Sequence, residues 1–227
     1  MIKTQIHYEG KVIPFYTAHE QHLFRYIQRS HTFYELELLE YIRDNLPNGS
    51  TAIDIGGNCG NHALYFAMHY PETHVFEANP LFKPILHKNL LEFDEHVHIY
   101  CPYALGAGVG WGSMAYPDGV ESDHTGELRA DGGDIPIFDL DGVIKINNIT
   151  PGFIKIDVEG SELEVLQGAF KTINEHIPEL FIECRTPVAY GEIYEFLEPL
   201  DYKPIREFGN KGGYTPVWHF SAQKGVF

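Results

Sequence analysis

The chain has 227 residues, of which 44% are hydrophobic, and its formal net charge is −16. A core of ordinary size can form, but so acidic a chain lacks the Lys/Arg track needed to bind a nucleic acid or an anionic membrane surface. The three cysteines form no CxxC pair, which argues against a disulfide framework or a thiolate zinc site. The sequence shows no apolar signal core and no run long enough to span a membrane, so we expect a cytoplasmic protein with reduced thiols.

The first 48 residues are expected to form a β-hairpin and two helices. Residues 4–16 alternate apolar and polar side chains around a Glu-Gly turn, and residues 19–29 and 33–46 have helical periodicity. From residue 49 onward, apolar runs of strand length alternate with helical patterns. We expect strands at 51–55, 74–77, 97–100, 152–157 and 179–183, and helices at 60–69, 81–91, 161–173 and 190–200.

Two further regions complete the pattern. Residues 106–134 are rich in Gly, Asp and Ser without a clear period, so we expect a long loop, followed by a short edge strand at 135–138 because Pro136 cannot donate to a ladder. Two terminal strands, 202–207 and 215–220, should add an antiparallel edge. The chain is therefore predicted to have an α/β fold with a doubly wound, mainly parallel Rossmann-like sheet, divided into an extension (1–48) that packs on the main domain (49–227).

The most informative motif is a glycine turn between two predicted strands. Asp54 and Glu77 end these strands, 23 positions apart, and Gly56 and Gly60 lie in the turn. This order is typical of nucleotide-binding α/β domains, in which the second acid binds a ribose and glycines allow the backbone to approach a ligand. An acid directly before the turn would repel a pyrophosphate but suits the positively charged S-adenosylmethionine. The alternative is a glycine-rich turn that binds no ligand.

Five blocks of the sequence follow one another over about residues 32 to 185, namely 32–37, 53–60, 75–80, 104–106 and 154–169. Together, in this order, they resemble the FkbM family of S-adenosylmethionine-dependent methyltransferases. In the donor loop, Asn58 replaces a glycine that is common in other methyltransferases. The resemblance implies a class I methyltransferase fold, S-adenosylmethionine as donor, S-adenosylhomocysteine as product, and mainly O-methylation of sugars and natural products, with some N-methylation.

Most of the candidate site residues would bind the donor. Asp54 would bind the donor's ammonium or a water, unless it caps the following helix, and Glu77 would bind the ribose hydroxyls, unless it is a surface acid. Glu159 would hold the ammonium or cap the helix that begins near residue 161. The remaining donor candidates are Gly56, Asn58 and Gly60 in the turn, Asp157 at the end of the fourth core strand, Ala104 and Leu105 beside the adenine or in the core, and Tyr34 and Glu35 closing over the donor or packing a helix.

Two residues are candidates for the chemistry. Asp157 ends the fourth core strand and would act as a base or orient the acceptor hydroxyl, although a surface ion pair with Lys155 is the alternative. His124 lies in the long loop and is a candidate general base near neutral pH. Glu183 would face the same pocket or pair with Arg185. Asp157, Glu159 and Glu183 also have ligand atoms that suit Mg²⁺ or Ca²⁺, but we expect no metal, and the histidines show no metal-like trio in the sequence.

The sequence thus predicts a methyltransferase that acts on a carbohydrate or another small hydroxyl-bearing acceptor, most simply a sugar of a glycan or glycolipid. Three alternatives stay open: methylation of a natural product or an amine, a non-catalytic module that binds S-adenosylmethionine, and a nicotinamide-dependent oxidoreductase. The loop over 106–134 and the segment after Glu183 match the family poorly. Since those regions would shape the acceptor pocket, the acceptor is the least determined part of the prediction.

Overall fold

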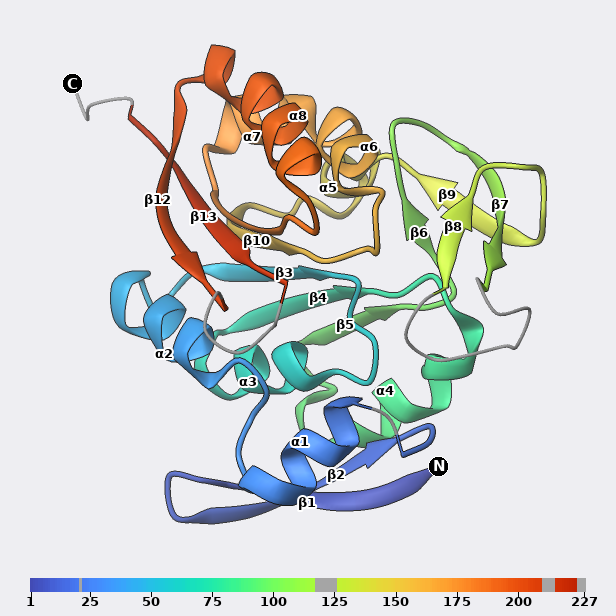
Figure 1. Cartoon of the computed structure of the whole chain (residues 1–227), viewed down its shortest axis with the longest axis vertical. Helices are drawn as coiled ribbons and strands as arrows, with labels where there is room; N and C mark the ends of the chain where they lie inside the picture. The colour runs from blue at the N-terminus through green and yellow to red at the C-terminus, as the bar shows by residue number, and fades with distance from the viewer. Residues whose placement is uncertain (21, 117–125, 210–214, 224–227) are drawn as a thin grey trace.

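The computed structural model describes residues 1–20, 22–116, 126–209 and 215–223. Within these ranges a central sheet is covered by helices on both faces, and a smaller sheet stands beside it (Figure 1). An N-terminal hairpin lies beyond one helical layer. No helix in the described part of the chain is long and apolar enough to cross a membrane.

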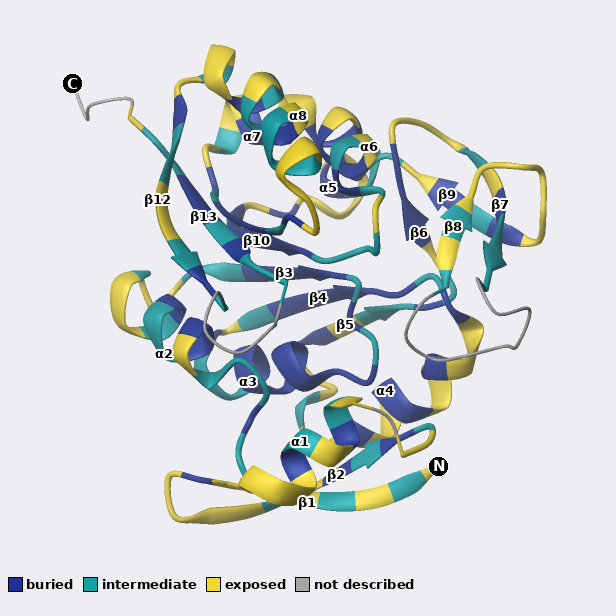
Figure 2. Ribbon diagram, in the orientation of Figure 1, coloured by how far each residue is buried: buried dark blue, intermediate teal, exposed yellow. Residues whose placement is uncertain are grey.

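The central sheet has seven strands in the order β12-β13-β11-β10-β3-β4-β5. The five strands from β11 to β5 are parallel, and β13 and β12 add the antiparallel edge that the sequence predicts. Because helices cover both faces, β3 and β4 are buried along almost their whole length (Figure 2), which explains their continuous apolar runs. The strands are β3 (Thr51–Ile55), β4 (Glu72–Phe76), β5 (Val97–Tyr100), β10 (Pro151–Ile156), β11 (Glu179–Glu183), β12 (Tyr202–Phe208) and β13 (Val217–Ala222).

Alternate side chains of the sheet pack into two hydrophobic cores, one on each face. Ala52 and Phe153 pack with the helices on one face, whereas Ile53 and Ile154 pack with those on the other. The first face is covered by α2 (Leu36–Asn45), α3 (Asn61–His69) and α4 (Lys83–Asn89). The second face is covered by α5 (Leu140–Asn147), α6 (Glu162–Gly168), α7 (Phe170–His176) and α8 (Pro187–Leu197). Short 3₁₀ turns are η1 (Pro80–Phe82), η2 (Leu91–Phe93) and η3 (Glu198–Leu200).

The N-terminal hairpin consists of β1 (Ile2–Tyr8) and β2 (Lys11–Thr17), and α1 (His22–Ser30) packs against it. Asn89 at the end of α4 joins the hairpin to the main sheet's helical layer. Its side chain accepts a hydrogen bond from the backbone N–H of Tyr16 and donates one to the Tyr16 carbonyl, both at 2.8 Å. A single amide thus satisfies both backbone groups of one residue in β2.

The region expected as a long loop instead contains part of a second sheet, in the order β6-β9-β7-β8. Its glycines allow backbones to approach closely: a Cβ on Gly133 would lie 2.4 Å from the carbonyl oxygen of Gly112. Strand 135–138 is also not an edge strand, because it pairs on both sides. The four strands are β6 (Ala104–Leu105), β7 (Gly110–Ala115), β8 (Glu127–Arg129) and β9 (Ile135–Phe138).

Two helical predictions also need correction. The helix expected over 161–173 is divided at Ala169 into α6 and α7, and α5 was not predicted at all. Gly168 is the last residue of α6, and a Cβ there would lie 1.9 Å from the Gly106 carbonyl oxygen, so the helix end packs directly on the turn after β6. For α5, Asp139 is the N-cap and accepts a hydrogen bond from the Gly142 N–H at 2.7 Å.

Candidate active site

A cavity opens at the carboxyl ends of β3, β4 and β10, where open α/β sheets bind their ligands. It is open to solvent, and both polar and apolar residues line it. The second sheet supplies one wall through Met114, Gly126 and Leu128, three residues from the region expected to be a loop. Most other lining residues belong to the sheet's carboxyl edge: Ile55, Gly56, Asn58, Phe76, Glu77, Ala78, Asn79, Asp157, Val158, Glu159 and Ser161.

The glycine turn after β3 is shaped by the protein's own packing. Gly56 has φ 88°, and a Cβ there would lie 1.7 Å from the carbonyl oxygen of Asp157, at the end of the neighbouring strand. A Cβ on Gly57 would lie 2.4 Å from Cγ1 of Val75. Gly60, with φ 87°, is the N-cap of α3. Gly56 and Gly57 are therefore needed for close contact with neighbouring strands, and Gly56 also lines the cavity, where it stays a candidate for binding a ligand.

Asn58 takes the left-handed conformation, with φ 48°, which asparagine tolerates better than most residues. Its side-chain oxygen accepts a hydrogen bond from the Cys59 N–H at 2.7 Å, and its own N–H donates to Oε2 of Glu77 at 2.7 Å. The asparagine that replaces the usual glycine therefore stabilises the turn and links it to the acid at the end of β4.

Glu77 lies just beyond β4 and is 8% exposed, so it is not a surface acid. Its other oxygen, Oε1, accepts a hydrogen bond from the Asn79 N–H at 2.7 Å. Burial, opposed by these backbone hydrogen bonds and reinforced by the charges of Asp54 and Asp157, raises the pKa of Glu77 to about 7. Each carboxylate oxygen can accept a second hydrogen bond, so the oriented side chain can still bind two hydroxyls.

Asp54 is fully buried and neither of its oxygens has a hydrogen-bond partner in the described part of the chain. It does not cap α3, whose N-cap is Gly60. Its nearest charge is the ammonium of Lys155, 3.7 Å from Oδ1. Buried carboxylate oxygens without partners are costly, so Asp54 is suited to receive hydrogen bonds from a ligand or from water.

Lys155 is 1% exposed, and its Nζ also lies 3.1 Å from Oδ2 of Asp157. The Lys155–Asp157 ion pair, which was the alternative to a catalytic Asp157, is present but is internal on the lysine side. Burial disfavours the charged ammonium, but the carboxylates of Asp157, Asp54 and Glu35 outweigh burial and raise the pKa of Lys155. A permanent cation thus lies at the centre of the acids.

Asp157 is half-buried and lines the cavity. Burial favours its neutral form, but Lys155 and His62 outweigh this effect and hold its pKa below the ordinary value. Its neighbour Glu183 ends β11, and Oε2 of Glu183 has no hydrogen-bond partner among the described residues. Burial and the charges of Asp157 and Glu159 raise the pKa of Glu183 to about 9, so this pair carries one proton at neutral pH.

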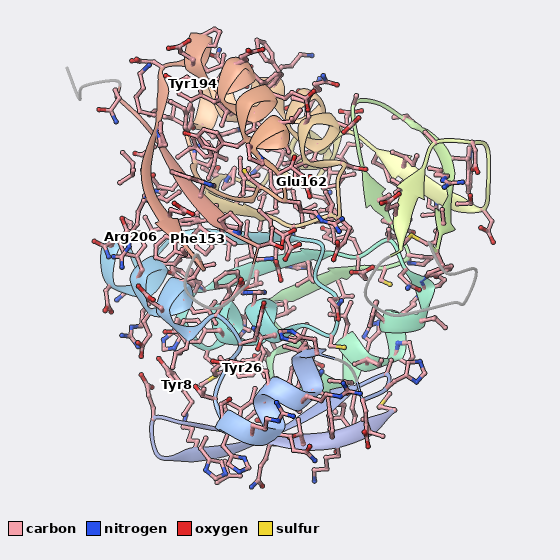
Figure 3. All side chains as sticks on the ribbon, viewed as in Figure 1. Tyr8, Tyr26, Phe153, Glu162, Tyr194 and Arg206 are labelled. Carbon is pink, nitrogen blue, oxygen red and sulfur yellow. The ribbon has the colours of Figure 1, made fainter. Side chains whose placement is uncertain are left out.

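Glu159 lines the cavity with a left-handed backbone, φ 60°, and its Oε2 lies 2.9 Å from Nη1 of Arg185. Burial and the charge of Asp157 raise its pKa to about 7, although Arg185 opposes the shift. It does not cap α6. That turn is held instead by Glu162, at the start of α6 (Figure 3), which accepts hydrogen bonds from the N–H groups of Val158 and Gly160 at 3.2 and 3.0 Å.

Tyr34 and Glu35 do not line the main cavity, although the charge of Glu35 acts on Lys155. Asn61 of α3 holds the backbone of Tyr34 through hydrogen bonds to its N–H and carbonyl, both at 3.0 Å. Oε2 of Glu35 lies 2.9 Å from Nε2 of His62. Glu35 acts electrostatically on Lys155, and His62 acts on Asp157. Both Tyr34 and Glu35 also line a second hollow, between this segment and β12.

The apolar wall of the cavity contains both residues predicted to lie beside an adenine. Ala104 and Leu105 are 4% and 3% exposed and line the cavity together with Phe76, Phe82 and Tyr103. They therefore serve the core and the cavity at once. Met114 and Leu128 were not predicted, and the irregular sequence around them gave no signal. His124, the other candidate base, lies outside the described residues.

The fold agrees with comparisons to known proteins. The model of the methyltransferase FkbM domain matches residues 54–204, more than half of the chain. A crystal structure of methyltransferase FkbM from Methylobacillus flagellatus KT has a TM-score of 0.59 at 18% identity, over 76% of this chain and 44% of that one. The chain thus spans less than half the length of that protein.

Two further solved structures share the fold. Precorrin-6y C5,15-methyltransferase from Geobacter metallireducens GS-15 has a TM-score of 0.53 at 14% identity, over 93% of this chain and 94% of that one. A putative RNA methyltransferase from Pyrococcus horikoshii has a TM-score of 0.53 at 11% identity, over 85% and 83%. No curated protein matches the sequence significantly. The chain belongs to the FkbM methyltransferase family and carries the domain of an S-adenosylmethionine-dependent methyltransferase.

Proposed function

We propose that the protein methylates a hydroxyl group of a sugar, within a glycan or glycolipid. When bound, S-adenosylmethionine supplies a methyl group on a positively charged sulfur, already activated for displacement. The observation that carries the proposal is the concentration of carboxylates at one cavity: Glu77, Asp157 and Glu159 line it, and Asp54 lies buried beside them. Carboxylates accept hydrogen bonds from hydroxyls, and their negative charge favours a cationic donor.

Two acids are suited to hold the donor. Glu77 is fixed by two backbone N–H groups with lone pairs to spare, which suits the adjacent hydroxyls of a ribose. Asp54, whose oxygens have no hydrogen-bond partner among the described residues, suits an ammonium group. Ala104 and Leu105 provide the apolar surface on which an adenine would pack. These features of the described residues fit the donor that family membership implies.

We assign Asp157 to the acceptor. Lys155 keeps it ionised, so it can accept a hydrogen bond from the acceptor hydroxyl and orient that oxygen. When the methyl carbon exchanges its bond to the donor's sulfur for a bond to the hydroxyl oxygen, S-adenosylhomocysteine would be left. The hydroxyl proton would then be strongly acidic and would pass to the Asp157 carboxylate, which needs no raised pKa for this step. Orientation of the reacting groups supplies up to about 7–11 kcal/mol of the barrier reduction, and the base adds about 10²–10⁴-fold in rate.

The opening of the cavity also favours a sugar. Tyr103 lines it and is 38% exposed, so an aromatic face is available at its rim. An adjoining hollow is lined by Glu127, Glu159, Arg185 and Thr186, polar groups that suit a polyhydroxylated ligand. The three cysteines are unpaired and buried, which supports our expectation of a cytoplasmic location.

The proposal is tested with Asp157→Asn in a methyl-transfer assay against a panel of sugars, glycolipids, natural products and amines. We expect turnover of a sugar by the wild type, a loss of about 10²–10⁴-fold in the variant, and donor binding retained in both. His124→Ala tests the other candidate base in the same assay. Turnover of amines alone would replace the proposed acceptor, and donor binding without turnover of any acceptor would favour a non-catalytic module.

A further inference from the structure

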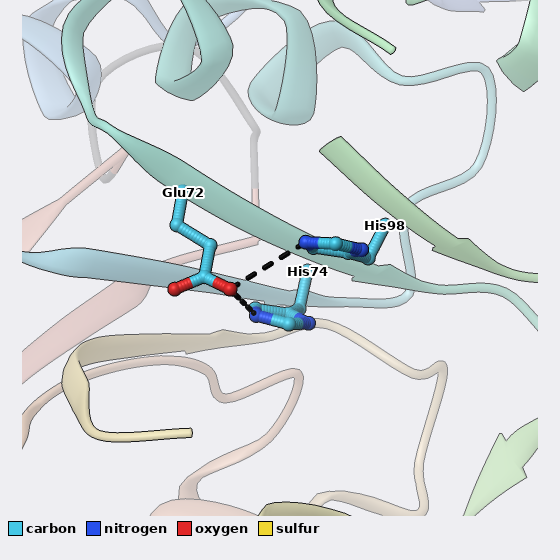
Figure 4. A group of neighbouring side chains, drawn as sticks. All are labelled: Glu72, His74 and His98. Atoms are coloured by element: carbon cyan, nitrogen blue, oxygen red, sulfur yellow. Dashed lines mark ion pairs between the residues drawn. The ribbon is translucent and has the colours of Figure 1, made fainter. Parts of the chain in front are cut away.

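Three potential metal ligands meet at the edge of the sheet opposite the cavity. Glu72 opens β4, and His74 projects from the same face because it lies two residues further on. His98 of β5 is the direct partner of His74 across the parallel pair. Figure 4 shows the three side chains converging. The sequence separates the two histidines by 24 positions, so only the strand register brings them together.

The ligand atoms lie near the spacing that a small metal ion requires, and rotation of the exposed His98 ring can complete it. Oε1 of Glu72 lies 3.1 Å from Nε2 of His74 and 3.5 Å from Nε2 of His98, and the three atoms all lie within 4.8 Å of one another. In a tetrahedral zinc site with bonds of about 2.0–2.1 Å, neighbouring ligand atoms are about 3.3 Å apart. The two carboxylate–imidazole distances, 3.1 and 3.5 Å, lie on either side of that value. Among the described residues, this is the one group of His, Cys, Asp and Glu with such spacing.

The buried Nε2 of His74 faces the carboxylate of Glu72. His74 is 2% exposed, and its Nε2 makes no hydrogen bond to the described residues, although it lies 3.1 Å from Oε1 of Glu72. Buried polar atoms of this kind usually have a partner. The other ring nitrogen, Nδ1, lies 3.3 Å from the hydroxyl of Tyr100. Metal-binding histidines characteristically use their second nitrogen in this way, which fixes the ring and leaves Nε2 to the ion.

The other two ligands are accessible to solvent. The side chains of Glu72 and His98 are 41% and 47% exposed, so an ion and its waters can reach the group. The imidazoles of His74 and His98 are stacked, with centroids 4.6 Å apart and planes 18° apart. Since a metal binds in the plane of each ring, the exposed His98 must turn away from the stack when the ion enters. His74 can stay in place.

We propose that Glu72, His74 and His98 bind a divalent transition-metal ion such as Zn²⁺, which joins β4 to β5 at the edge remote from the methyl-transfer cavity. Two imidazoles, one carboxylate and a water complete a tetrahedral set for zinc. Imidazole ligands disfavour Mg²⁺ and Ca²⁺, which prefer oxygen. The site is distinct from the acids Asp157, Glu159 and Glu183, and it does not depend on the proposed acceptor.

Calorimetric titration of the EDTA-treated full chain with ZnCl₂ tests the site. We expect one saturable site in the wild type, a rise in thermal unfolding temperature with Zn²⁺, and no comparable effect of Mg²⁺. His98→Ala removes an exposed ligand and should fold normally, yet weaken Zn²⁺ binding by more than about tenfold, since loss of even an outer partner has that effect. His87→Ala, an exposed histidine on α4, is the matched control.

The outcomes separate a built site from adventitious zinc on a chain with thirteen histidines. Binding that His98→Ala weakens and His87→Ala leaves unchanged supports the site. Tetrahedral absorption bands from bound Co²⁺ that disappear in His98→Ala would support it further. If the wild type binds no Zn²⁺, or if both variants bind it as the wild type does, the proposal is overturned.

Discussion

The ammonium of Lys155 lies 3.1 Å from Oδ2 of Asp157, two residues further along the same strand end. Lys155 is almost fully buried, and the same nitrogen lies 3.7 Å from the fully buried Asp54. One internal cation therefore offsets two of the carboxylates beside the cavity. Buried charges are tolerated only when they are paired, so this lysine allows acids for the donor and for the acceptor to stand side by side.

Replacing Lys155 with Met should destabilise the protein strongly. The change keeps much of the side-chain volume but leaves Asp54 and Asp157 without their cation, which costs about 3–5 kcal/mol in comparable buried pairs. Lys203→Met is the control, because Lys203 forms an exposed pair with Glu198 that is worth at most about 1 kcal/mol. Urea unfolding gives both values. Equal losses of stability in the two variants would show that the internal ion pair contributes no more than the exposed one.

Gly56→Ala should be more damaging than its backbone angle alone explains. Gly56 and Gly10 have similar φ values, 88° and 76°, but a Cβ on Gly10 meets nothing within 4 Å. We expect Gly10→Ala to cost about 1–2 kcal/mol, the left-handed penalty, and Gly56→Ala more than about 3 kcal/mol, because its Cβ also strikes the Asp157 carbonyl. Measured free energies of unfolding of the two variants test this difference. Similar costs would mean that φ, rather than close contact, demands the glycine at 56.

The parallel sheet was predictable because its signals are local. Buried strands such as β3 appear as short apolar runs, and β3 was predicted with its observed bounds. The second sheet was not predictable in the same way. A strand as short as β8, with three residues, has no measurable period. The glycines of this region allow close contact between segments distant in sequence, such as Gly112 and Gly133.

The site shows the same division between local and distant signals. The positions of Glu77 and Asp157 followed from strand ends, since the carboxyl edge of a parallel sheet collects whatever residues end its strands. The cluster of His74 and His98 depends on strand register, and the contributions of Met114 and Leu128 depend on a sheet the sequence does not signal. The sequence pattern also did not predict which charged residues are buried. Lysine is usually a surface residue, but Lys155 is internal.

Glu183 should make stability depend on pH. Burial and neighbouring acids raise its pKa from 4.5 to about 9 in the folded state. Between these values the folded chain keeps a proton that the unfolded chain has lost, so the stabilisation is fully present below about pH 4.5 and is lost as pH rises toward 9. Glu183→Gln cannot titrate and should lose less stability than the wild type between pH 6 and pH 9.

Urea unfolding at several pH values in that interval measures this difference. The exposed Glu175→Gln serves as the control and should follow the wild type throughout. Parallel curves for the wild type and Glu183→Gln would contradict the assignment of a retained proton to this carboxyl.

Glu77→Gln tests the donor site itself, by calorimetric titration with S-adenosylhomocysteine at pH 8, above the pKa of about 7 at which Glu77 ionises. Losing the charged acceptor should weaken binding by about 10- to 150-fold, corresponding to hydrogen bonds of about 1.5–3 kcal/mol to a charged group. The exposed Glu92→Gln should bind as the wild type does. If folded wild-type protein binds no S-adenosylhomocysteine, or if Glu77→Gln binds it as tightly as the wild type, then the cavity beside Glu77 is not the methyl-donor site.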